Sequence, residues 1–319
     1  ERIIGKAIKG RRDKVIVGTK FSPENSGYKT IICAAEASLK RLETDYIDLY
    51  QIHWPNPTFP LEETMKAMED LTRQGKVRHI GVGNLSLIEL KEAQSFSNRT
   101  LASIQLEYNL FDRMVEKTIL PFCEQNKTFL IAYSPIDQGR VADGKRQRKV
   151  LEEIAEKYEK TPAQIALRWL IHQPMVVVIP KASGMKHLQA NAEAANFDLS
   201  DEDILTIADA CARPITYVPP DQIQVSLQGQ GYRRTYQTLE TAKENAMGNV
   251  PSPSDLATTM IKDQGIKPVR LIDNPNLTDR HPYHLVEGRI RYWAWVIAHD
   301  NLPIPSYIRE DWPNNTALA

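Results

Sequence analysis

The stretch YIDLYQIH, residues 46–53, decides the predicted fold of this chain. It is short, apolar and rich in aromatic and β-branched side chains, which favours a β-strand. An amphipathic stretch at residues 61–74 follows it and ends at Gly75, a residue that commonly terminates helices. One strand followed by one helix is the repeating unit of an α/β protein.

The same alternation continues on both sides of this unit, from residue 14 to about residue 196. Six strands that alternate with helices predict a parallel sheet with helices on its outside. The further strands are expected at residues 14–20, 78–83, 101–106, 127–133 and 175–179. The further helices are expected at 28–42, from Ser86 onward, at 112–126 and 147–158, from Thr161-Pro162 onward, at 185–196, and from Ser200 to about Cys211.

A closed (β/α)8 barrel requires eight strands, so an open, doubly wound sheet stays an alternative at this point. The doubly wound dinucleotide-binding fold carries a GxGxxG motif after a strand, and this sequence has none. Residue 1 lies in what reads as the end of a helix. We therefore expect an α/β fold of the TIM-barrel type that lacks its first strands.

The composition excludes several classes of partner. Lysine plus arginine number 40 and aspartate plus glutamate number 40, so neither nucleic acid nor an anionic membrane is expected as the main partner. The apolar runs are too short to span a bilayer. The cysteines Cys33, Cys123 and Cys211 form no CxxC pair, which disfavours a disulfide framework or a zinc site. This usage fits a reducing compartment, so we expect a cytoplasmic location and no metal.

Polar or aromatic side chains stand at the carboxyl ends of the successive predicted strands. Each has an ordinary explanation alone: a lysine is usually a solvated charge, a histidine can be satisfied in a core, and an asparagine after a glycine fits a turn. Their order along the chain favours function, because the strand ends of a β/α barrel converge on the catalytic face. The residues are Lys20, His53, Asn84, Gln105, Tyr133 and Lys181.

Five motifs, taken in order, resemble those of the aldo-keto reductase family. They are GTK at residues 18–20, DYIDLYQIHWP at 45–55, GKVRHIGVGN at 75–84, YSP at 133–135 and IPK at 179–181. The likeness covers residues 1–211. It implies hydride transfer from a nicotinamide cofactor to the carbonyl carbon of an aldehyde or ketone.

The resemblance also implies a catalytic set of four side chains. A tyrosine of the family donates a proton to the carbonyl oxygen, a lysine lowers the pKa of that tyrosine, a histidine orients the carbonyl, and an aspartate pairs with the lysine. Lys20 and His53 match two of them. The tyrosine and the aspartate would precede residue 1 in the family pattern, so we expect little reductase activity from these 319 residues alone.

The cofactor contacts implied by the resemblance fall on residues along the whole matched region. The family often carries an arginine where His187 stands, and a neutral histidine is a weaker anion ligand than a guanidinium. The resemblance makes NADP the expected cofactor, and the histidine at position 187 leaves NAD open. Tyr133 would stack under the nicotinamide ring, Asn84 and Gln105 would bind its carboxamide, Ser134, Gln138 and Gly139 would follow the pyrophosphate, Lys181, Ser183, His187 and Asn191 would hold the adenosine end, and Trp54 would line the substrate pocket.

The alternation ends near Arg213, and we place a domain boundary between residues 212 and 213. In residues 213–319, a strand at 223–226, a helix near 251–257, a short strand at 267–269 and the helix start GRIRYWA at 288–294 resemble a ParB/sulfiredoxin-like domain, a small α+β fold. Arg289 stands where a sulfiredoxin has its cysteine, so reduction of sulfinic acid is not expected.

This second resemblance implies that Gly288, Arg289 and Arg291 bind nucleotide phosphates, since a helix N-terminus attracts anions. The alternative is a structural salt bridge made by Arg291, with Trp293 in a core. The main hypothesis is an NADP-dependent reductase of small-molecule aldehydes or ketones. The second is a nucleotide-binding or phosphotransfer regulator whose barrel senses the state of the nicotinamide, and the third is a non-catalytic barrel.

Overall fold

The computed structural model describes residues 1–137, 139, 145–225, 236–263, 266–278 and 281–309. Contacts between residues divide the chain into two compact units. The first unit comprises Glu1–Val141 and Ile154–Ile204, and the second comprises Ala142–Glu153 and Leu205–Ala319. Helices α6 (Lys145–Lys157) and α9 (Asp201–Cys211) therefore contribute residues to both units.

A parallel sheet of six strands forms the centre of the first unit. The strands lie in chain order, and each pairs in parallel with the next. A doubly wound sheet reverses its strand order at a switch point, so this order excludes that alternative and agrees with a barrel-like α/β fold. The strands are β1 (Gly18–Phe21), β2 (Ile47–Ile52), β3 (Val77–Gly83), β4 (Ser103–Glu107), β5 (Phe129–Tyr133) and β6 (Val176–Val178).

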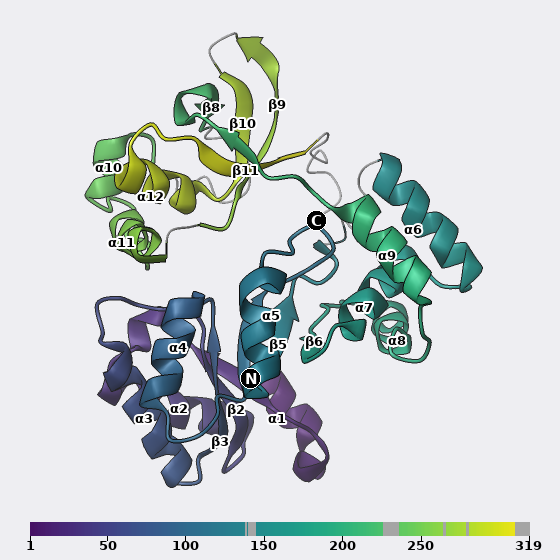
Figure 1. Cartoon of the computed structure of the whole chain (residues 1–319). Helices are drawn as coiled ribbons and strands as arrows, with labels where there is room; N and C mark the ends of the chain where they lie inside the picture. Colours follow the sequence, from purple (N-terminus) through teal and green to yellow (C-terminus); the bar gives the residue numbers. More distant parts are fainter. Residues whose placement is uncertain (138, 140–144, 226–235, 264–265, 279–280, 310–319) are drawn as a thin grey trace. The chain divides into compact units, whose positions relative to one another are not determined.

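Helices connect the strands, as the sequence predicts. They are α1 (Arg2–Ile8), α2 (Tyr28–Leu42), α3 (Leu61–Arg73), α4 (Leu87–Phe96), α5 (Val115–Asn126), α7 (Pro162–His172) and α8 (Met185–Glu193), with short 3-10 turns η1 (Arg12–Lys14) and η2 (Pro23–Asn25). Helix α2 packs on β1 and on α3, α3 packs on β3, α5 on β5 and α7 on β6. Figure 1 shows α2, α3 and α4 grouped beside the first strands.

Three helix starts predicted from the sequence are confirmed by their hydrogen bonds. The Ser86 hydroxyl accepts the N–H of Glu89 at 3.2 Å, and the Glu89 carboxylate accepts the N–H of Ser86 at 2.8 Å. Thr161 and Gln164 form the same reciprocal pair at the start of α7, and the Ser200 hydroxyl caps α9. These bonds satisfy N–H groups that a helix leaves open in its first turn.

The predicted strand at residues 14–20 is wrong at its start, because β1 begins only at Gly18. The Asp48 carboxylate accepts the N–H of Val17 at 2.9 Å, and the Arg12 guanidinium donates to two nearby carbonyl oxygens. Side chains therefore satisfy backbone groups that a longer strand would have paired. The bounds of the other predicted strands differ from those of β2 to β6 by one or two residues at an end.

The interior of the sheet is closely packed next to the strand ends. A Cβ on Gly81 would lie 2.4 Å from the Ser103 Oγ and 2.9 Å from the Gln51 Cγ. Gln51 donates a buried hydrogen bond of 3.2 Å to Ser103. Side chains two residues apart on a strand share a face. The next layer on this face therefore consists of His53, Gly83 and Gln105.

The second unit contains a mixed sheet of five strands in the order β7-β11-β9-β10-β8. The strands are β7 (Thr216–Val218), β8 (Ile223–Gln224), β9 (Val269–Thr278), β10 (His281–Glu287) and β11 (Ile304–Arg309). The helices are α10 (Leu239–Lys243), α11 (Pro253–Asp263) and α12 (Arg289–His299), with a 3-10 turn η4 (Pro220–Gln222) before β8. Helices α10 and α11 both pack against α12.

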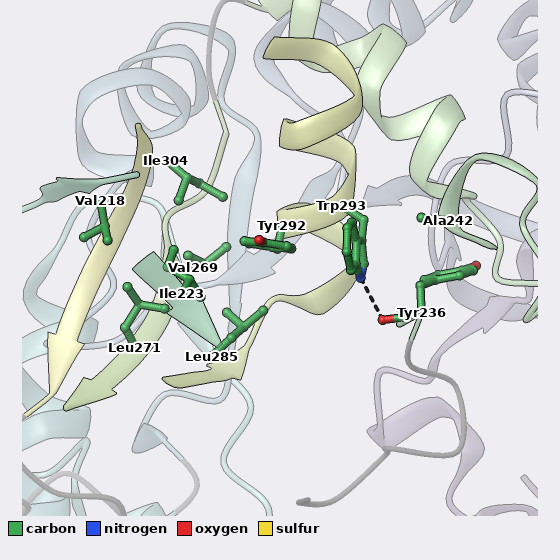
Figure 2. Packing of buried hydrophobic residues seen from close by; sticks show 10 residues of the cluster. All are labelled: Val218, Ile223, Tyr236, Ala242, Val269, Leu271, Leu285, Tyr292, Trp293 and Ile304. Atoms are coloured by element: carbon green, nitrogen blue, oxygen red, sulfur yellow. Dashed lines mark hydrogen bonds between the residues drawn. The ribbon is translucent and has the colours of Figure 1, made fainter. Parts of the chain in front are cut away.

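The core of the second unit lies between this sheet and α12. Trp293 is 8% exposed, and its indole N–H donates to the backbone carbonyl of Tyr236 at 2.9 Å, as Figure 2 shows. Trp293 is thus a core residue. The other buried members of this core cluster are Val218, Ile223, Ala242, Val269, Leu271, Leu285, Tyr292 and Ile304.

Among the described residues, no helix combines the length and the apolarity that crossing a membrane requires.

Candidate active site

The carboxyl ends of the first five strands surround one pocket of about 250 Å³. The structure brings together here six residues that the sequence singles out for catalysis, cofactor or substrate. The pocket is lined by Lys20, His53, Trp54, Gly83, Asn84, Gln105 and Tyr133.

Asn84 makes hydrogen bonds to three other residues around this pocket. It has a left-handed backbone with φ 58°, a conformation that asparagine tolerates better than most residues. Its side-chain amide donates to the backbone carbonyl of His53 at 2.8 Å, and its backbone N–H donates to that of Gln105 at 3.0 Å. Its Oδ1 accepts the hydroxyl of Tyr133 at 3.1 Å. Asn84 therefore links the ends of β2, β4 and β5.

Gly83 lines the same pocket, although the sequence analysis did not single it out. A Cβ at this position would lie 2.6 Å from the Ile52 carbonyl oxygen and 3.1 Å from that of His53. Glycine therefore allows β2 and β3 to approach closely at the pocket. The signal in the sequence is the pair of glycines two residues apart, Gly81 and Gly83, on one face of the strand.

Two titratable side chains of the pocket have shifted pKa values. Partial burial lowers the pKa of Lys20 below its ordinary value. Partial burial also lowers the pKa of His53, and the positive charge of Lys20 lowers it further. An unperturbed histidine has a pKa of about 6.5, so this lowering of the pKa favours the neutral form of His53 at pH 7. A neutral imidazole keeps one N–H donor and one acceptor nitrogen.

A tight turn follows the strand that carries Tyr133. Ser134 has a left-handed backbone with φ 50°, and its carbonyl accepts the N–H of Asp137 at 2.9 Å. Gly139, at φ 87°, donates its N–H to the carbonyl of Ile136 at 2.9 Å. Gln138, which the sequence assigns to cofactor binding, lies outside the described residues.

Asn109 braces this turn from the segment after β4, and the sequence analysis missed it. The residue is 1% exposed, and its Nδ2 donates to the Ser134 carbonyl at 3.2 Å. Its Oδ1 accepts two backbone N–H groups of its own loop, those of Phe111 and Asp112. The local signal for this side-chain turn is an asparagine just after a strand, but that signal does not reveal the partner in another loop.

The residues assigned to the adenosine end do not line the pocket. They lie in the connection after β6 and on α8, which begins after Gly184 without a side-chain cap. His187 and Asn191 are one helical turn apart and so lie on one face of α8. Lys181, Ser183 and His187 are exposed, whereas Asn191 is half-buried.

The three residues assigned to a nucleotide in the second unit lie at the start of α12. Gly288 is the N-cap residue, with φ 96°. Arg291 donates to both backbone carbonyls of residues 267–268 and pairs with Glu287 at 3.9 Å. These contacts favour a structural role for Arg291. Arg289 is half-buried, and nucleotide binding by Gly288, Arg289 and Arg291 stays a prediction.

Comparison with known proteins agrees with the motifs and the fold. The profile of the Aldo/keto reductase family matches residues 1–212. Methylglyoxal reductase YeaE of Escherichia coli is 39% identical over 216 residues, which cover 67% of this chain and 76% of that protein. Glyoxal reductase of Bacillus subtilis is 37% identical over 193 residues, which cover 60% of this chain and 67% of that protein.

Solved structures show the same similarity. A thermostable aldo-keto reductase in complex with the inhibitor epalrestat superposes with a TM-score of 0.63 at 42% identity, covering 66% of this chain and 76% of that one. An aldo/keto reductase from Klebsiella pneumoniae in complex with NADP and acetate superposes with a TM-score of 0.60 at 36% identity, covering 65% of this chain and 74% of that one. Motifs, strand order, sequence identity and superposition all agree, and this chain belongs to the aldo/keto reductase family.

Proposed function

We propose that this chain binds NADPH and reduces the carbonyl group of small aldehydes or ketones. The observation that carries the proposal is the pocket itself, where a lysine, a histidine, two side-chain amides and a tyrosine meet at the ends of parallel strands. Two of the similar proteins are reductases of methylglyoxal and glyoxal, and another was crystallised with NADP. These relatives support a short aldehyde as substrate and NADP as the cofactor.

The chemistry of the pocket fits a nicotinamide. A carboxamide carries an NH₂ donor and a carbonyl acceptor, and Asn84 and Gln105 offer the complementary groups. The ring of Tyr133 offers a flat surface on which a planar ring can stack. When bound, the cofactor supplies the hydride. His53 and Tyr133 already hold the side chain of Asn84 by hydrogen bonds, so cofactor binding costs little conformational entropy at this residue.

His53 and Lys20 act on the carbonyl oxygen of the substrate in this proposal. Neutral His53 donates its N–H to that oxygen, and the charge of Lys20 stabilises the negative charge that develops there. Trp54 is 41% exposed beside them and can cover a bound substrate against water.

The remaining cofactor contacts extend from the pocket to α8. Ser134 and Gly139, with Gln138, follow the pyrophosphate. Lys181, Ser183 and His187 hold the phosphate of the adenosine end, with Asn191 at the adenine. The exposed positions of Lys181, Ser183 and His187 support this assignment, because a bulky anionic group can reach them.

A titration of the full chain with NADPH tests the proposal. We expect saturable quenching of tryptophan emission for the wild type. Tyr133→Ala should weaken binding at least about fivefold, since stacking of a planar base on an aromatic ring contributes about 1–3 kcal/mol. Tyr217→Ala is the matched control, because Tyr217 is 66% exposed on β7 of the second unit. A wild-type chain that shows no saturable binding would refute the proposal.

We further propose that residues 1–212 and 213–319 are separate domains and that the second is ParB/sulfiredoxin-like. The family profile ends at residue 212, α9 ends at Cys211 and the second sheet begins with β7. By their contacts, Ala142–Glu153 and the part of α9 from Leu205 onward belong to the second unit. Gly288, Arg289 and Arg291 are the proposed phosphate ligands of that domain.

We also propose a cytoplasmic location. Cys33 and Cys123 form no disulfide with a described residue, and cysteines outside disulfides are typical of reducing compartments.

A further inference from the structure

Asn109 uses its whole side chain to join two loops, although it does not line the pocket. Its Oδ1 accepts the N–H groups of Phe111 at 3.0 Å and Asp112 at 2.9 Å, which closes a turn directly after β4. Its Nδ2 donates at 3.2 Å to the carbonyl of Ser134, in the turn that follows β5. With 1% of its surface exposed, the amide has no competing water.

The backbone conformation of Ser134 depends on this contact, because Asn109 holds the Ser134 carbonyl. Ser134 has φ 50°, a conformation that costs a non-glycine residue free energy and persists only where neighbours hold it. The hydrogen bonds of the described residues at this point include three: the N–H of Tyr108 donates to the Tyr133 carbonyl at 3.4 Å, and the N–H of Asp137 and the amide of Asn109 both donate to the Ser134 carbonyl. Asn109 supplies the one side-chain contact among them.

The backbone at Ser134 separates two features of the candidate site. Before it lies Tyr133, whose hydroxyl bonds to Asn84 at 3.1 Å in the pocket. After it begins the turn in which the Ser134 carbonyl accepts the N–H of Asp137. The carbonyl that Asn109 binds belongs to the peptide that joins Ser134 to residue 135. Without this bond the backbone dihedral angles of Ser134 are less restrained, and a change in them would shift the turn relative to the ring of Tyr133.

We infer that Asn109 is a positioning residue for cofactor binding. By holding the Ser134 carbonyl it fixes the backbone where the turn leaves Tyr133, so that the ring and the following turn face the nicotinamide and pyrophosphate together. This inference rests on the proposed function. It assigns to Asn109 an effect on the nicotinamide–pyrophosphate half of the cofactor and none on the adenosine half, which lies with α8.

Two substitutions separate the roles of the Asn109 amide. In Asn109→Ser, the hydroxyl can still accept N–H groups of its own turn, but it is too short to reach Ser134. In Asn109→Asp, both acceptor oxygens remain, but an ionised carboxylate cannot donate to the Ser134 carbonyl. When protonated, that carboxyl regains a donor.

The experiment compares two ligands on the full chain, NADPH and 2′,5′-ADP, which carries only the adenosine end. We expect Asn109→Ser to weaken NADPH binding about tenfold, as loss of a buried hydrogen bond suggests, and to change 2′,5′-ADP binding less than twofold. Asn126→Ser is the matched control. Asn126 also donates its side-chain amide to a carbonyl, that of Phe122 at 2.8 Å, at the end of α5 and away from the pocket.

A pH series with Asn109→Asp gives a second test that does not depend on the first variant folding. We expect its NADP⁺ affinity, relative to wild type at each pH, to recover as the introduced carboxyl is protonated in acid. Equal weakening of both ligands by Asn109→Ser, unchanged NADPH binding, or no recovery in acid would each overturn the inference. If the wild type binds 2′,5′-ADP but not NADPH, or binds neither, the proposed function fails and the inference fails with it.

Discussion

At the scale of single residues, Asp48 shows how one carboxylate can organise the start of a strand. The residue is 6% exposed, and it accepts the N–H of Val17 at 2.9 Å. It also pairs with Arg12 at 2.7 Å and with Arg78 at 2.9 Å. Both guanidinium groups lie over the ring of Tyr46, at 3.8 and 3.7 Å from its centroid. Asp48 thus anchors a cluster away from the pocket, with a structural role.

We expect Asp48→Asn to lower the free energy of unfolding by about 2 kcal/mol at pH 7, measured by urea titration, because the amide leaves two buried or half-buried donors poorly paired. Glu36→Gln is the control. Glu36 is 52% exposed and pairs with Lys76 at 2.7 Å on the surface, so its loss should cost less than about 0.5 kcal/mol. Equal effects of the two substitutions would contradict the assigned role of Asp48.

The same residue predicts a dependence on pH. Burial acts to raise the pKa of Asp48, but the N–H of Val17 and the charges of Arg12 and Arg78 outweigh it, so the pKa is lowered from its ordinary value of 3.8. The folded state therefore holds the proton less tightly than the unfolded state. The stabilisation that the Asp48 carboxylate contributes is complete above about pH 4. It is lost as the pH falls through the pKa of Asp48 in the folded state. The stability gap between wild type and Asp48→Asn should shrink from pH 7 to pH 3.

At the scale of helices and strands, Gln164 ties α7 to α8. Its Oε1 accepts the N–H of Thr161 in the cap of α7, while its Nε2 donates to the Ala190 carbonyl on α8 at 3.0 Å. Gln164→Glu keeps the cap, because glutamate is a common partner there, but removes the donor to α8 and places a carboxylate near Glu193. We expect 2′,5′-ADP to bind about three- to tenfold more weakly in fluorescence titrations, since α8 carries His187 and Asn191.

The matched control for Gln164→Glu is the same substitution at Gln94. Gln94 also bridges with both ends of its amide, accepting from Leu101 and donating to Arg99 at 3.0 Å, but it lies on α4. Gln94→Glu should leave the affinity for 2′,5′-ADP unchanged. If the two variants weaken binding to the same extent, α8 does not hold the adenosine end in the proposed way.

The bounds of a helix or strand were predictable where the interactions that set them are local in the sequence. Helix α2 spans the predicted residues 28–42, and α7 starts after Thr161 as expected, because apolar spacing and capping act within a few residues. The start of β1 depends on Asp48, which is 31 residues from Val17 in the chain, and no local pattern reports that contact. Asn109 was missed for the same reason, since Ser134 is 25 residues away.

At the scale of the whole molecule, the strand ends were predictable because parallel topology gathers them automatically. In a β/α sheet, residues far apart in sequence reach one edge if each stands at a carboxyl end, which is why Lys20, His53 and Tyr133 could be grouped in advance. The second unit offers no such rule. Its sheet order β7-β11-β9-β10-β8 combines parallel and antiparallel pairs, and the cluster around Trp293 joins residues from 218 to 304.

Hydrogen exchange of the full chain, read by mass spectrometry, tests the two-domain proposal. We expect NADPH to slow exchange in peptides that cover residues 77–84, 103–109 and 129–134 and the α8 segment, because ligand binding suppresses local opening where contacts form. Residues 216–309 should exchange as before, since their core packs within its own unit. The same measurement with ATP tests the second domain. Slower exchange confined to the start of α12 would support nucleotide binding at Gly288 and Arg289. NADPH protection of equal size in both units would show that residues 1–212 and 213–319 do not behave as separate domains.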